Sequence, residues 1–148
     1  MPKKRYCNVR RMNKIIAALK TEAAKKMFDM RSYIKLGKKP PREAFKSKGD
    51  CGTAACIAGM AAIIAPKFFN INNCGIIRGN PPYFLEAMDA FADWLDIPKD
   101  DAFLITEPKE VVWVKHKYKD ISHAINVLEA YRDGGMDLVG KIEGVELA

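Results

Sequence analysis

The feature that most constrains the fold is an uncharged run from Thr53 to Ala65, which Pro66 ends. Residues 54–65 carry no polar side chain apart from that of Cys56. A helix that is apolar on every side is normally surrounded by other elements. The run is far shorter than the roughly 20 residues that span a bilayer. The sequence therefore predicts that Thr53–Ala65 is the central helix of a core.

Three further segments have the spacing of amphipathic helices, with apolar residues three or four positions apart. They are 8–34, 81–95 and 121–133, and a short helix starts at Pro98. Residues 110–118 are rich in β-branched and aromatic side chains and could form a strand. A chain of 148 residues suits one core. We therefore expect one compact, mainly α-helical domain with a single short β element near 110–118.

The segments between these helices are predicted to be less regular. Residues 1–7 are expected to form a flexible arm, and 136–148 are a tail without an assigned structure. Residues 35–48 form a basic linker, because the glycine and the two adjacent prolines within it interrupt a helix. Residues 67–80 contain Asn and Gly turn signals and are expected to be an irregular connection.

Charge is distributed unevenly along the chain. Residues 1–48 hold 16 Lys and Arg against 3 Asp and Glu, whereas residues 49–148 hold 9 against 15. The first third is therefore strongly cationic within a chain of net charge +7. This division indicates either an anionic partner for the N-terminal third or docking of that third onto the acidic remainder. A basic helix face that only keeps the protein in solution remains an alternative.

The four cysteines do not suggest a metal site. Cys7, Cys51, Cys56 and Cys74 form no CxxC pair, and the chain has only two histidines. Zinc-finger spacing is therefore missing, and we expect no metal and no cofactor. The basic residues near the N-terminus are followed by polar residues and not by an apolar segment, so we predict neither a signal peptide nor a membrane partner.

The turn before the central helix could bind an anion. Gly49 and Gly52 permit tight backbone turns, and the N–H groups at a helix start attract phosphate or carboxylate. The carboxylate of Asp50 could instead cap those N–H groups. The predicted ligand-binding residues combine this turn with the basic linker: Lys38, Lys39, Arg42, Lys46, Lys48, Gly49, Gly52 and Thr53.

Cys51 offers a catalytic alternative. A thiolate at a helix N-terminus is stabilised by the backbone, and His116 or His123 could act as its base. The pattern does not fit a papain-like protease, because the chain contains no Gln. It does not fit a Cys-x5-Arg phosphatase either, because no cysteine is followed six residues later by an arginine. A partly buried thiol beside a helix cap is the simpler interpretation.

Several stretches together resemble a widespread group of small proteins encoded by bacteriophages and bacteria. The resemblance depends on "FDM" at 28–30, "CGTAACIAG" at 51–59, "WLDIPKDDAF" at 94–103 and "ISHAINVL" at 121–128. The CGTxxCIAG block is its most specific part, and the resemblance implies no activity. It implies an origin in a phage or a bacterium, and with no signal peptide or membrane span predicted, we expect a location in the cytoplasm of a prokaryotic cell.

Together these features predict a small non-enzymatic binding protein, of the phage accessory or host-interaction type. Its expected partner is an anionic ligand, a nucleic acid or an acidic host protein, bound by the basic N-terminal third. The alternative is a thiol-dependent enzyme that uses Cys51 with His116 or His123.

Overall fold

The structure is a computed structural model, which describes residues 5–27, 34–35, 37, 41–46, 54–55, 57–72, 76–80, 86–106, 114–115, 121–141 and 146–147. The helices are α1 (Val9–Leu19), α2 (Glu22–Met27), α3 (Pro41–Lys46), α4 (Ile57–Ile64), α5 (Ala87–Leu95), α6 (Lys99–Thr106) and α7 (Ile121–Val139). The strands form three antiparallel pairs: β1 (Ile34–Lys35) with β2 (Ala54–Ala55), β3 (Phe69–Ile71) with β4 (Ile77–Gly79), and β5 (Val114–Lys115) with β6 (Glu146–Leu147). The described residues are mostly helical, which confirms the predicted mainly α fold class.

Helix α4 lies in the core, as the apolar run predicts. Every residue from Ile57 to Ile63 is buried, and α1, α3, α5 and β3 contact the helix. The helix is shorter than the predicted Thr53–Ala65, because Ala54 and Ala55 belong to β2 and pair with Lys35 and Ile34. Strand pairing satisfies the backbone of those two alanines in place of a helical turn.

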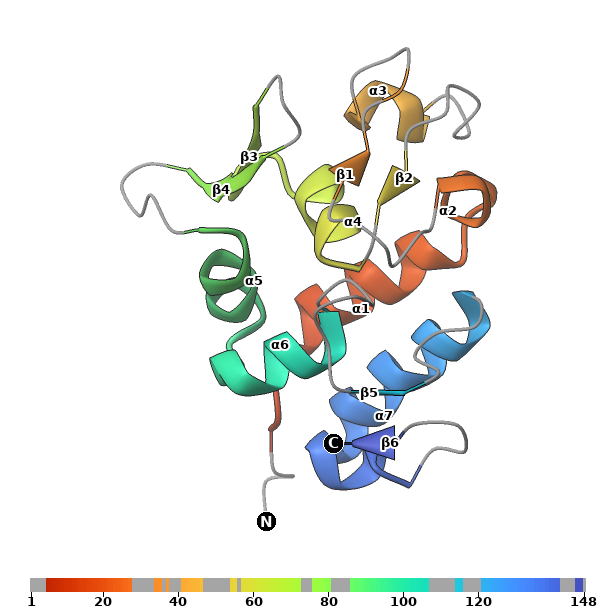
Figure 1. The fold of residues 1–148 in the computed structure, drawn as a ribbon, viewed down its shortest axis with the longest axis vertical. Helices are drawn as coiled ribbons and strands as arrows, with labels where there is room; N and C mark the ends of the chain where they lie inside the picture. The colour runs from red at the N-terminus through yellow and green to blue at the C-terminus, as the bar shows by residue number, and fades with distance from the viewer. Residues whose placement is uncertain are drawn as a thin grey trace.

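The predicted helix over 8–34 is divided into α1 and α2. Asn8 caps α1, since its side chain accepts a hydrogen bond from the Arg11 backbone N–H at 3.1 Å. Thr21 separates the two helices: its hydroxyl donates to the Ala18 carbonyl at 2.7 Å and accepts from the Ala24 N–H at 3.2 Å. Helix α1 passes through the middle of the molecule, between α4 and α7 (Figure 1).

Residues 5–7, expected in a flexible arm, lie against the core. Cys7 is 1 % exposed, and Tyr6 packs against the buried cluster. The Tyr6 ring contacts α7 at Gly135, where a Cβ atom would lie 2.6 Å from the Tyr6 Cδ1. Gly135 has a φ of 68°, which favours glycine, and it kinks α7 near the predicted helix end. These contacts bury apolar surface of Tyr6 and Cys7, whereas Arg5 is exposed.

The connection over 67–80 contains a β-hairpin and is not irregular. Phe69 pairs with Gly79, and Ile71 pairs with Ile77. The hairpin extends beside α4 and α5 (Figure 1). Asn80 does not cap α5, which begins at Ala87; its amide donates to the Pro66 carbonyl at 2.9 Å.

Helices α5, α6 and α7 complete the core. Helix α5 buries the predicted apolar face, including Met88, Phe91 and Leu95. The Tyr131 hydroxyl on α7 donates to Asp101 Oδ2 on α6 at 2.7 Å, which joins these two helices. Within the predicted β segment 110–118, Val114 and Lys115 form β5, and its partner strand comes from the tail that the sequence left unassigned.

Candidate anion-binding surface

The basic residues of the N-terminal third divide into two groups, one inward and one outward. On α1 the apolar side chains of Met12, Ile15, Ile16 and Leu19 are buried. The opposite face is exposed and carries Arg10, Asn13, Lys14 and Ala17, with Lys20 immediately after the helix. We call these five residues the α1 stripe. It extends about 15 Å along the helix axis, at roughly 1.5 Å per residue.

Within the described part of the chain, the cations of the α1 stripe have no acidic partner. Among the described residues, no ion pair involves Arg10, Lys14 or Lys20. In contrast, Lys25 on α2 pairs with Glu22 at 3.1 Å. The described part of the protein therefore does not neutralise the exposed basic face of α1 with its own acidic residues.

Arg11 points inward, away from the α1 stripe. Its Nη1 donates to the Trp94 carbonyl at 2.8 Å, near the end of α5. Its guanidinium carbon lies 5.6 Å from the Phe68 ring centre and 5.8 Å from that of Trp94. Beside it the Asn8 N–H donates to the Leu95 carbonyl at 2.6 Å. Arg11 therefore satisfies a terminal carbonyl of α5 and stacks on two rings, so its charge serves the fold.

Arg42 also points inward, although the sequence predicts it as a ligand-binding residue of the basic linker. Its Nη2 donates to the Ala62 carbonyl at 3.0 Å and to the Phe69 carbonyl at 2.8 Å. Ala62 would bond to the N–H of Pro66 in a longer helix, but proline has none. Arg42 supplies the missing donor, and burial lowers the pKa of its guanidinium. Residues 41–46 form α3, so this part of the linker is helical.

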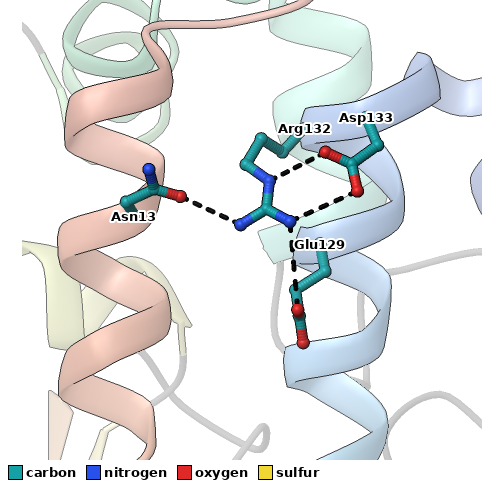
Figure 2. A network of polar contacts seen from close by, with 4 residues as sticks. All are labelled: Asn13, Glu129, Arg132 and Asp133. Atoms are coloured by element: carbon teal, nitrogen blue, oxygen red, sulfur yellow. Dashed lines mark hydrogen bonds and ion pairs between the residues drawn. The ribbon is translucent and has the colours of Figure 1, made fainter.

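A polar network joins the α1 stripe to α7 (Figure 2). Arg132 donates from Nη1 to Asn13 Oδ1 at 3.0 Å. It also donates from Nε and Nη2 to the two carboxylate oxygens of Asp133, at 2.9 and 3.2 Å, and its Nη2 lies 3.9 Å from Glu129 Oε2. The bond to Asp133 raises the pKa of Arg132. The guanidinium thus offsets two carboxylates of α7 while it bonds to the α1 stripe.

Most of the predicted site lies outside the described residues. This applies to Lys38, Lys39, Lys48, Gly49, Gly52 and Thr53, and to Cys51 and His116 of the catalytic alternative. Lys46 lies in α3 and His123 in α7, but their side chains are also outside the described part. Their roles in ligand binding or catalysis therefore stay predictions. Cys7 is the described free cysteine; burial raises the pKa of its thiol, which disfavours the reactive thiolate.

Sequence reasoning missed Asn13 and Arg132. The helical spacing does place Asn13 between Arg10 and Lys14 on the polar face of α1. Its bond to Arg132 spans 119 residues, and no local pattern indicates it. The packing of α1 on α7 decides this contact.

Comparison with protein-family models, with curated proteins and with solved structures found no match to this chain. Among the described residues, no three His, Cys, Asp or Glu side chains gather as a metal site would require. No helix in the described part is long and apolar enough to cross a membrane.

Proposed function

We propose that this protein is a non-enzymatic binding protein that contacts nucleic acid through the α1 stripe. One observation carries the proposal: Arg10, Lys14 and Lys20 lie on one exposed helix face without an ion pair among the described residues. Unpaired cations that face solvent attract a polyanion and release its counterions on binding.

The length of the α1 stripe favours a polymer of phosphates over a single nucleotide. The three cations are separated along the helix axis by about 6 and 9 Å. One strand of duplex DNA carries a phosphate every 3.4 Å or so along its axis. Several phosphates can therefore contact the α1 stripe together, whereas one small anion would reach a single cation.

The resemblance of the CGTAACIAG block supports a setting for this activity. We place the protein in the cytoplasm of a prokaryotic cell, as an accessory or host-interaction factor encoded by a phage. The basic linker residues Lys38, Lys39, Lys46 and Lys48 remain predicted ligand-binding residues on the evidence of the sequence.

The test measures binding to a fluorescently labelled duplex by anisotropy over a salt series. The variant Arg10→Gln/Lys14→Gln/Lys20→Gln lowers the net charge from +7 to +4. The matched control Lys67→Gln/Arg78→Gln/Lys141→Gln makes the same change at exposed positions outside the α1 stripe. The slope of log affinity against log salt concentration is negative, and in the stripe variant it should become shallower by about 2.7, at roughly 0.9 per lost phosphate contact.

Equal weakening of both variants would mean that only net charge matters, and this would contradict a binding site on α1. If the protein binds no nucleic acid but binds an acidic protein through the α1 stripe, the partner is an acidic protein and not a nucleic acid.

A further inference from the structure

The orientation of one side chain determines what kind of contact the α1 stripe can make. Arginine has only donors, so the Asn13 atom that faces Arg132 at 3.0 Å must be the amide oxygen. Figure 2 shows this oxygen directed at the guanidinium and the amide nitrogen turned away from it. Asn13 is exposed, so its NH2 group remains available beside Arg10 and Lys14.

The α1 stripe consequently presents side-chain donors only. Arg10, Lys14 and Lys20 have no acceptor atom, and Ala17 has no polar atom. The single side-chain acceptor of these five residues, Asn13 Oδ1, is directed at Arg132. Asparagine reads adenine with its oxygen and its nitrogen together. In the orientation that Arg132 holds, Asn13 does not present both atoms to one base edge.

Resting on the proposed function, we infer that Asn13 serves the α1 stripe as a donor to the phosphates of duplex nucleic acid and not as a reader of adenine, and that Arg132 is the positioning residue that holds Asn13 in this orientation. Phosphate oxygens accept hydrogen bonds and carry the negative charge that the stripe complements. The stripe contains no aromatic ring. Stacking on unpaired bases, which favours single strands, therefore cannot come from these residues.

Arg132 also protects the charge of this surface. It makes a two-bond contact with Asp133 and lies near Glu129, so the guanidinium that bonds Asn13 also compensates two carboxylates of α7. Loss of the guanidinium would therefore make the electrostatic potential beside Asn13 more negative. Arg132 thus acts through its neighbours and need not touch the nucleic acid.

The experiment compares A·T-rich, G·C-rich and mixed duplexes of equal length and salt with the wild-type chain. The affinity for the A·T-rich duplex should exceed that for the G·C-rich duplex by no more than about threefold, because a donor to phosphate carries no sequence information. A preference of tenfold or more for the A·T-rich duplex that Asn13→Ala abolishes would overturn this inference and leave the proposed function intact. If no duplex binds, the proposed function itself fails.

Two variants test the roles of Asn13 and Arg132. Asn13→Ala removes an exposed donor and should lower the affinity for every duplex equally, by about two- to tenfold, which corresponds to one net hydrogen bond. Arg132→Gln should lower the affinity for every duplex more than the control Arg78→Gln does, which removes one charge from the β3–β4 hairpin. Arg132→Lys keeps the charge, so its affinity for duplex should lie between the affinities of Arg132→Gln and the wild type. An unchanged Asn13→Ala, or equal effects of Arg132→Gln and Arg78→Gln, would overturn the assigned roles.

Discussion

At the scale of single residues, the same side-chain type serves opposite purposes in the basic third. Arg11 and Arg42 donate to carbonyls at the ends of α5 and α4, whereas Arg10 faces solvent. A guanidinium has five donors in a fixed geometry, so it can satisfy several buried acceptors at once. Cationic composition alone therefore overstates the charge available to a partner.

Arg42→Met should destabilise the protein and leave its affinity for nucleic acid within about twofold. The change removes the donors to the Ala62 and Phe69 carbonyls, and unsatisfied buried acceptors cost about 1–3 kcal/mol. Urea unfolding measures the loss, with Arg10→Met as the exposed control that should change stability by less than about 0.5 kcal/mol. A stable Arg42→Met variant with lost binding would instead return Arg42 to the binding surface.

At the scale of elements, most segments took the predicted class but different boundaries. The end of α4 at Ile64 follows from Pro66, which local chemistry explains. Local chemistry does not explain the start of α4 at Ile57, because Ala54 and Ala55 pair with β1, which lies about twenty residues earlier in the chain. The β3–β4 hairpin escaped notice because each strand has only three residues, too few for an alternating pattern.

The link between α6 and α7 gives a prediction for stability and its pH dependence. Tyr131→Phe removes the bond to Asp101 and should cost about 1–2 kcal/mol at pH 7. Burial, with the bond to Asp101, raises the pKa of Tyr131 in the folded protein above the unfolded value of about 10. Above pH 10 the unfolded state loses this proton and the folded state keeps it, so stability falls as the pH rises.

Chemical unfolding from pH 8 to 11 tests this dependence. The wild-type stability should decline more steeply than that of Tyr131→Phe, by up to about 1.4 kcal/mol per pH unit. Parallel curves would show that Tyr131 ionises equally in both states.

At the scale of the whole molecule, the fold leaves like charges adjacent on α1, because its other face is buried against α4, α5 and α7. Neutralising Arg10, Lys14 and Lys20 together should therefore not destabilise the protein. We expect unchanged or slightly higher stability at low salt, within about 0.5 kcal/mol, since surface substitutions rarely exceed this range. Thermal unfolding of the triple variant measures it. A loss above about 1 kcal/mol would mean that these cations support the fold and not a partner.

The sequence by itself determined the mainly α class, the buried position of the apolar run and the polar face of α1. These three features depend on the spacing of hydrophobic residues and on the position of proline, and both are local properties of a few neighbouring residues. Only the tertiary structure decided which arginines point inward, that residues 5–7 pack on α7, and that Arg132 holds Asn13. Each of these depends on a donor meeting an acceptor, or a ring meeting a glycine, from distant parts of the chain. Such contacts exist only after the helices have packed.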